Sequence, residues 1–185
     1  MGFLIAIGAL VLIALFGISV FNKFVKNKNQ VKDAWSNIDV ALKRRYDLIP
    51  NLVETVKGYA SHEKGTLENV IQARNAAVSV PQGDINAQIK AENQLQQTLR
   101  SIFALSEAYP DLKANVNFID LQNKLSEIEE ALERSRRFYN STVRENNTYG
   151  ESFPGVVFAG MMPYQSFDYF EATATERESS KVDFS

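Results

Sequence analysis

The stretch VKDAWSNIDVALKRRYDLIPNLVETVKGY, residues 31–59, repeats apolar side chains with the alternating four- and three-residue steps of a helix in a bundle or coiled coil. Two series with seven-residue intervals form the pattern: Val31, Ile38, Leu52 and Tyr59, with Arg45 in the slot between, and Trp35, Leu42, Ile49 and Val56. Pro50 removes one backbone donor, so we expect a kink near Tyr46–Asp47. The pattern runs on to about Val80 and ends in the loop SVPQGD, residues 79–84.

Two more long helices are expected after this loop. The first reads from Ile85 to Tyr109, with Asp84 near its N-cap. Its apolar face includes Leu95, Leu99 and Ile102, while Gln88, Lys90, Glu92 and Arg100 are expected to face out. The next helix runs from about Asp111 to Asn146 and buries the seven-residue series Phe118, Leu125, Leu132 and Tyr139. Its exposed face carries paired charges: Lys124, Glu127, Glu129, Glu130, Glu133, Arg134 and Arg137.

The C-terminal part is less regular. The apolar stretch VVFAGMMPY, residues 156–164, is interpreted as a short helix across the end of the bundle. The alternative is a weak membrane-surface contact through Phe158, Met161, Met162 and Tyr164. Residues 166–185 are expected to form a short docking segment and a flexible acidic tail. The sequence therefore predicts an all-α fold, an antiparallel bundle of three long helices plus a short C-terminal helix.

The first 21 residues contain no charged side chain. As a helix, the apolar run from Phe3 to Phe21 would cover about 28 Å, close to the thickness of a hydrocarbon core. We interpret residues 1–21 as an uncleaved transmembrane anchor whose apolar side chains are Phe3, Leu4, Ile5, Leu10, Val11, Leu12, Ile13, Leu15, Phe16, Ile18, Val20 and Phe21. A signal peptide is the competing interpretation, but no basic residue precedes the run, the run is long, and no A-x-A cleavage site follows it.

A basic juxtamembrane segment, residues 22–32, follows the anchor. Its lysines, expected to contact anionic lipid head groups, are Lys23, Lys26, Lys28 and Lys32. Because all of them lie on the C-terminal side of the apolar run, the positive-inside tendency favours a cytoplasmic domain at the inner membrane of a cell. The final stretch, residues 151–185, is acidic, and both charged flanks have the simpler interpretation of solvated surface.

Composition limits the remaining choices. Residues 33–165 are the right length for one helical domain between the basic segment and the tail. The net charge of −2 gives no basic excess, so no nucleic-acid partner is predicted. The chain has no cysteine, which excludes disulfides, thiolate metal sites and thiol catalysis.

No catalytic residue, metal or cofactor is predicted. His62 is the one histidine, and HEKGT lacks the second histidine of a zinc-protease helix. The glutamate-rich stretch 127–133 lacks the Glu-x-x-His pairs of a di-metal bundle. No phosphate-binding loop, nucleophile elbow or catalytic triad is present.

The densest candidate for a structural or interaction role is KRRYDLIPNL, residues 43–52, with Arg44, Arg45, Tyr46, Asp47 and Pro50. Arg45 lies on the apolar seam, where an unpaired charge is costly, so we expect an acidic or carbonyl partner, with Asp47 and Glu107 as the candidate acids. The stretch is read either as an ion pair near a proline kink or as a docking surface. Trp35 is interpreted as a core anchor or an interfacial residue, and Tyr109 and Pro110 as a helix–helix turn.

Two blocks of the chain resemble the LemA family: DAWSNIDVALKRRYDLIPNLVETVKGYASHEKGTLENVIQAR and ENQLQQTLRSIFALSEAYPDLKANVNFIDLQNKLSEIEEALERSRRFYN, with YFEA near the C-terminus. The resemblance extends from Asn27 to about Ala172. It implies a bacterial protein with a short N-terminal membrane segment and an all-α domain of long antiparallel helices, and it assigns no catalytic residues. Many members carry a lipobox cysteine and are exported. This chain lacks that cysteine, which favours a spanning anchor, while the exported side stays open.

The leading hypothesis is a non-enzymatic, membrane-anchored scaffold that acts through protein–protein contacts and homo-oligomerisation. Its expected partners are membrane lipids, further copies of the chain and, by resemblance alone, a membrane protease or its cofactors. The alternative is a tethered sensor or adaptor that binds a ligand or lipid between its helices. This alternative predicts a cavity lined by apolar residues with a few polar groups.

Overall fold

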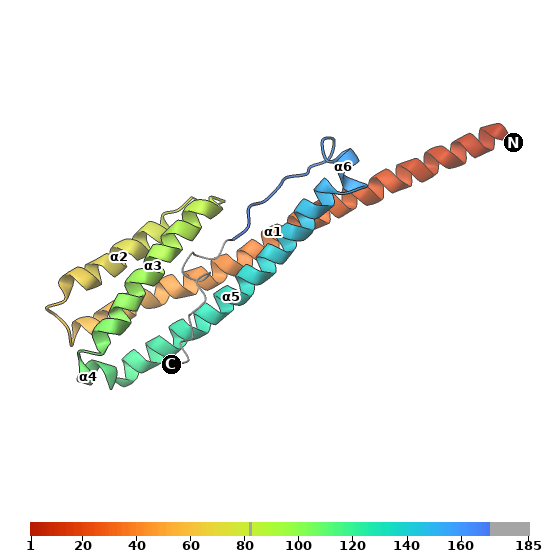
Figure 1. The fold of residues 1–185 in the computed structure, drawn as a ribbon. Helices are drawn as coiled ribbons and strands as arrows, with labels where there is room; N and C mark the ends of the chain where they lie inside the picture. The colour runs from red at the N-terminus through yellow and green to blue at the C-terminus, as the bar shows by residue number, and fades with distance from the viewer. Residues whose placement is uncertain (82, 171–185) are drawn as a thin grey trace, which may run out of the picture. The chain divides into compact units, whose positions relative to one another are not determined.

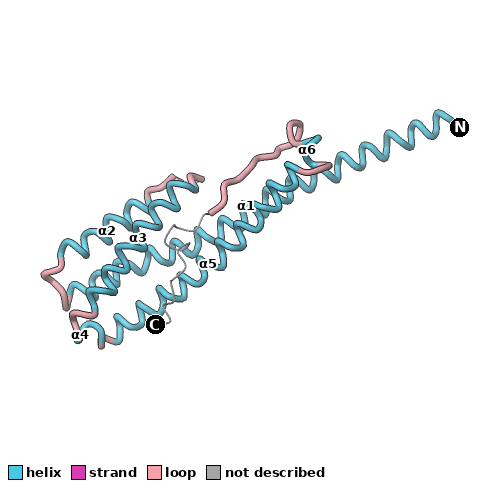
Figure 2. The backbone as a smooth tube through the Cα atoms, in the orientation of Figure 1, coloured by secondary structure: helices cyan, strands magenta, loops and turns pink. Residues whose placement is uncertain are grey.

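The computed structural model describes residues 1–81 and 83–170, and helices are the regular structure of these residues (Figures 1 and 2). No strand occurs in the described part of the chain. The elements are α1 (Gly2–Lys57), α2 (Lys64–Val78), α3 (Ile85–Ser106), α4 (Pro110–Lys113), α5 (Val116–Glu151) and α6 (Gly155–Phe158). The all-α prediction is therefore confirmed, and residues 171–185 of the predicted tail lie outside the described residues.

The first long helix is shorter than its apolar pattern predicts. It runs through Pro50 without interruption but ends at Lys57, and residues 58–63 form a turn before α2. The turn closes through backbone hydrogen bonds from Ala60 N to Val56 O (2.8 Å) and from Glu63 N to Ala60 O (3.1 Å). Tyr59 is 42% exposed, so the last member of the seven-residue series does not belong to the core. A single helix reaching Val80 was the wrong prediction.

The later helix boundaries follow local capping groups. Asp84 caps α3, because its Oδ1 accepts a hydrogen bond from Ala87 N at 2.9 Å. Pro110 stands at the first position of α4, where its missing N–H costs nothing. Asn115 Oδ1 accepts a hydrogen bond from Phe118 N at 3.0 Å and so caps the start of α5.

Contacts divide the described chain into two compact units. The first unit comprises residues 1–38 and 134–169, and the second comprises residues 39–133 with Phe170. Helices α1 and α5 contribute residues to both units.

The second unit is an up-and-down arrangement of four helical segments around an apolar core. Residues of α1 after position 38 and residues of α5 before position 134 join α2 and α3 (Figure 1). The predicted seven-residue series supply much of this core, which includes Ile49, Leu52, Val56, Val70, Leu95, Leu99, Ile102, Phe118 and Leu125. Complete burial of an aliphatic or aromatic side chain contributes about 1.5–3 kcal/mol, so this core is the main source of the unit's stability.

In the first unit, α1 and the end of α5 pack antiparallel through aromatic pairs. The Trp35 and Tyr139 rings meet edge to face at 5.3 Å, and the Phe24 and Tyr149 rings at 4.9 Å. Trp35 is partly buried, so it does contribute to the packing as its register predicts.

The chain after α6 returns along α5 and is fixed to it by side-chain amides. Asn146 Nδ2 donates to Gln165 O at 2.8 Å, and Asn147 Nδ2 donates to Phe167 O at 2.9 Å. Tyr139 completes the attachment with a 2.9 Å bond from its hydroxyl to the backbone oxygen of Asp168. The predicted docking segment therefore begins at Gln165.

Candidate functional site

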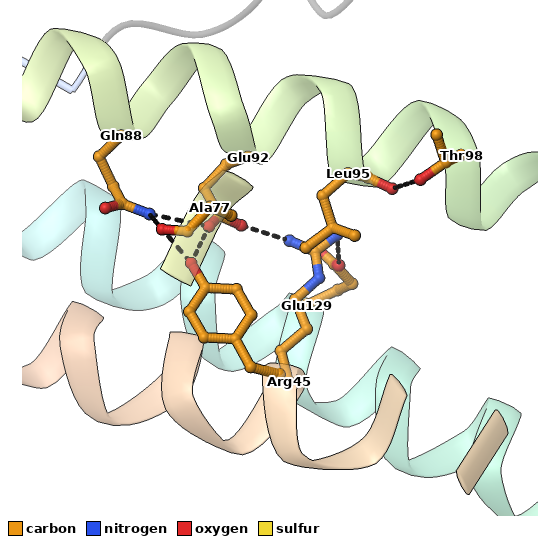
Figure 3. Close-up of polar contacts among 8 residues, drawn as sticks. Arg45, Ala77, Gln88, Glu92, Leu95, Thr98 and Glu129 are labelled. Carbon is orange, nitrogen blue, oxygen red and sulfur yellow. Dashed lines mark hydrogen bonds and ion pairs between the residues drawn. The ribbon is translucent and has the colours of Figure 1, made fainter. Parts of the chain in front are cut away.

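Arg45, on α1, is the centre of a buried charged network in the second unit (Figure 3). Its Nη1 lies 3.1 Å from Glu92 Oε2 on α3, and its Nη2 lies 2.7 Å from Glu129 Oε1 on α5. The side chains of Arg45 and Glu92 are each 1% exposed, whereas Glu129 is 37% exposed. One guanidinium therefore joins three helices, and Glu92 is the partner that shares its burial.

Tyr46 and Gln88 complete the environment of Glu92. The Tyr46 hydroxyl donates to Glu92 Oε1, and Gln88 Nε2 donates to the same oxygen at 3.0 Å and to the Tyr46 hydroxyl at 2.9 Å. Burial, followed by the charge of Glu92, raises the pKa of Tyr46 well above its usual value. The phenol therefore stays protonated and keeps donating its hydrogen bond to Glu92.

Arg45 was predicted to lie on the apolar seam and to need an acidic or carbonyl partner; its burial confirms the first point, and its pairing with Glu92 meets the second through an acid. The predicted partners were wrong. Asp47 pairs instead with Lys43 at 2.8 Å, and Glu107 pairs with Lys113 at 2.5 Å. Residue 47 lies two positions from Arg45 and therefore points to another side of the helix, since residues two apart on a helix do not face each other.

Glu92 was predicted to face out, and that prediction was also wrong. The signal for its burial is in the sequence: Glu92 stands seven residues before Leu99 and three before Leu95, on the same helical stripe. An acid on the stripe of one helix matches the arginine on the stripe of another. Glu129 was likewise assigned to the solvated face, and instead it reaches Arg45.

The other candidate residues do not join this network. Arg44 and Pro50 are exposed on α1, and Arg44 belongs to the solvent-facing side of the KRRY sequence. The Tyr109 hydroxyl donates to Glu63 Oε1 over 3.4 Å, and Pro110 begins α4, so this pair forms the predicted helix–helix turn.

The residues predicted as membrane anchor lie at the exposed end of α1. Nearly all of the apolar side chains before Ile18 are open, and α1 is the one helix in the described residues that is long and apolar enough to cross a membrane. Val20 is instead buried within the first unit. Among the predicted head-group lysines, Lys26 and Lys32 are exposed, while Lys23 pairs with Glu145 on α5 at 2.5 Å.

Two hollows open on the second unit. One has a volume of about 580 Å³ and lies between the end of α1 and α2. Its lining residues are Val53, Glu54, Lys57, Ser61, Lys64, Leu67, Glu68, Ile71 and Gln72. The other is about 280 Å³ and lies between α3 and α5, and its lining includes Arg100, Glu129 and the buried Arg45. No cluster of His, Asp or Glu able to hold a metal ion occurs in the described ranges, 1–81 and 83–170.

The chain is similar to proteins of one family. The model of the LemA family matches residues 34–184. A relative named Protein LemA, from Metamycoplasma hominis, is 24% identical over 156 residues, which cover 84% of this chain and 71% of the relative. The matched range begins within α1, after the apolar segment and its lysines, and includes the Arg45 network.

Proposed function

The chain belongs to the LemA family, and from this premise we propose that it is a non-enzymatic, membrane-anchored helical scaffold that acts through protein–protein contacts. The observation that carries the proposal is that different parts of α1 have different surroundings. Its first residues expose an uncharged apolar surface, and the same uninterrupted helix supplies core residues to both units. A helix of this kind suits a protein whose task is to hold a rigid surface at a bilayer.

The Arg45 network supports a structural role for the second unit. The Arg45 guanidinium pairs with Glu92 and Glu129 on two other helices, and the tyrosine is held in the protonated form. Such a network fixes the register of three helices, which is the best-attested use of buried ion pairs. A fixed helix register keeps the surface of a scaffold in one arrangement, and this role requires no reactive group.

Self-association is proposed to use exposed apolar side chains near the start of α5. Val116 and Ile119 are large, exposed and three positions apart on one helix face. Anchoring confines such surfaces to a plane, so weak contacts between copies add by multivalency. A membrane protease or its cofactor remains a proposed partner by family resemblance alone.

The mass of the full chain, extracted in mild detergent, tests self-association. We expect particles larger than a monomer whose proportion falls on dilution, and a lower proportion for Val116→Lys/Ile119→Lys. Asn117→Lys is the matched control, because this exposed residue of the same helix points about 100° away from Val116 and about 160° away from Ile119. A strictly monomeric particle at all concentrations contradicts this part of the proposal, and crosslinking in native membranes then identifies other neighbours.

The anchor and its sidedness need separate measurements. Leu10→Arg/Ile13→Arg is expected to release the chain from membranes into alkaline carbonate, because each arginine costs about 2.5–3.5 kcal/mol at the centre of a span. Retention of that variant contradicts the anchor.

The four lysines favour a cytoplasmic domain, so protease added to intact cells should leave the C-terminus intact. Cleavage would place the domain on the exported side.

A second candidate function is a tethered adaptor that binds a ligand or lipid. The groove between α1 and α2 favours it, because about 580 Å³ is within the usual range of ligand pockets and its base contains Val53 and Leu67. Lys64 lines the groove and suits an apolar ligand with an acidic end, while Lys57 is paired with Glu54 at 3.3 Å. Binding of a fluorescent fatty acid that is lost in Leu67→Trp supports this role; equal binding by that variant removes it.

A further inference from the structure

The segment that contains α6, residues 153–161, exposes a group of large apolar side chains. Phe153 is 80% exposed, Val157 61% and Met161 84%. Between Glu151 and Asp168 the chain has no charged residue. Solvated turns rarely combine these properties, and a contiguous apolar surface of this kind commonly marks an interaction site.

The position of this segment beside α1 indicates what covers it. The Phe158 ring packs edge to face against Phe16, with 6.1 Å between ring centroids (Figure 1 shows α6 beside α1). Phe16 lies five residues before Phe21, the end of the apolar run, which corresponds to about 7.5 Å along a helix. Phe158 packs beside Phe16, which lies inside the apolar run. A bilayer that surrounds the whole apolar run therefore extends past the depth of Phe158.

Close packing fixes the segment in this position. A Cβ atom at Gly155 would lie 1.9 Å from Tyr149 O and 3.5 Å from the Phe24 ring, so only glycine allows this approach. The Phe24 ring in turn contacts Tyr149 at 4.9 Å and Tyr164 at 5.7 Å. These two tyrosines stand close to the level of Lys23, and aromatic side chains of this kind are enriched where membrane meets water.

We propose that residues 153–161 insert into the bilayer leaflet that faces the domain and form a second, shallow membrane contact beside the anchor. Amphipathic elements of this type bury about 5–10 Å into the boundary between head groups and acyl chains, which agrees with the level of Phe158. The inference rests on the proposed transmembrane role of α1. It replaces the interpretation of this stretch as a helix that only covers the end of the bundle.

The absence of cysteine makes a labelling test direct. The full chain is reconstituted into vesicles of phosphatidylcholine and phosphatidylglycerol as single variants Val157→Cys, Leu10→Cys and Ser141→Cys, each labelled with a nitrobenzoxadiazole dye. Leu10 is an exposed residue of the apolar run, and Ser141 is an exposed residue of α5. We expect nitroxide-labelled lipid to quench the dye at position 157 several-fold more than at 141, with blue-shifted emission, as at position 10.

Three results overturn the inference. If the dye at position 157 behaves like the one at 141 while position 10 is quenched, the second contact is wrong and the anchor stands. If position 10 is not quenched, the proposed anchor has failed and the second contact falls with it. If the blue shift at position 157 disappears when the protein is diluted with more lipid, a second copy of the chain covers the segment instead.

A pair of glycine variants keeps the test independent of any one label site. In the Val157→Cys chain, Gly155→Ala must displace α6 because of the contact with Tyr149 O, so we expect quenching to fall at least twofold. Gly160→Ala is the matched control, since a Cβ there meets no atom within 4 Å. Equal quenching in both variants would contradict the proposed seating of the segment.

Discussion

Replacing Arg45 with methionine should destabilise the second unit far more than the same change at its neighbour Arg44. Arg45 and Glu92 are each 1% exposed and 3.1 Å apart, so Arg45→Met leaves a carboxylate buried without its cation. Breaking such a pair costs about 3–5 kcal/mol. Because Tyr46 and Gln88 still donate to Glu92, we expect a loss near 3 kcal/mol.

Two variants separate the pair from simple loss of packing. Arg44 is exposed, so Arg44→Met should change the free energy of unfolding by less than about 0.5 kcal/mol. In Arg45→Met/Glu92→Met both charges are gone and Tyr46 can still bond to Gln88, so we expect the double variant to regain about 2 kcal/mol relative to Arg45→Met.

Urea unfolding of the full chain in detergent micelles, followed by circular dichroism at 222 nm, measures these differences. If residues 1–21 are the proposed anchor, they stay helical in the micelle and add a constant signal. If Arg45→Met matched Arg44→Met within about 0.5 kcal/mol, the network would have no stabilising role. The single variant Glu92→Met completes the comparison. If the double variant lost as much stability as Arg45→Met and Glu92→Met lose together, the two charges would not be coupled.

Three further outcomes are expected. Both polar atoms of the Asn27 side chain are buried without a hydrogen-bond partner, so Asn27→Leu should stabilise the first unit by about 1–3 kcal/mol; Trp35 fluorescence during urea unfolding reports it, and a loss of stability would contradict it. Burial, and then the charge of Asp168, raises the pKa of Tyr139 to about 12 from 10.0, so its stabilising contribution is complete below pH 10 and is lost as the pH rises toward 12. Tyr139→Phe should therefore show a smaller loss of stability over that interval, and an unchanged alkaline profile would count against the assignment. Asp84→Ala removes the cap of α3 and should cost about 0.5–2 kcal/mol, whereas Asp111→Ala, at an exposed position in α4, should cost less.

The sequence predicts the core of this fold well because heptad spacing depends only on local helix geometry. Val31, Ile38, Leu42, Ile49 and Leu52 are all buried as their register requires. Heptad spacing gave a wrong prediction at residues 58–63, where a tight turn replaces the helix. The apolar spacing continues to Tyr59 although the helix has already ended at Lys57. Local pattern alone does not determine where a helix ends.

The Arg45 network could be predicted only in part. The position of Arg45 on the apolar stripe predicted an acidic or carbonyl partner, but which group pairs with it depends on which helices become neighbours. Glu92 and Glu129 are distant in sequence from Arg45 and from each other, so the sequence does not indicate that they meet. Both were predicted to lie on the surface because they are charged, although Glu92 has the helical register of a buried residue. A charged residue on an apolar stripe should be read as buried once a complementary charge occupies the stripe of another helix.

The first unit is discontinuous in the chain, and this affects the order in which the protein folds. Residues 39–133 separate its two parts, so α1 leaves the ribosome long before the section of α5 that packs on it. At roughly 5–20 residues per second, the delay is on the order of 5–20 s. During that time the second unit can close around its own core, while Phe24 and Val31 have no partner helix. The packing of these apolar side chains is therefore completed only after synthesis reaches Asp168, when the Tyr139 hydroxyl can bond to its backbone oxygen.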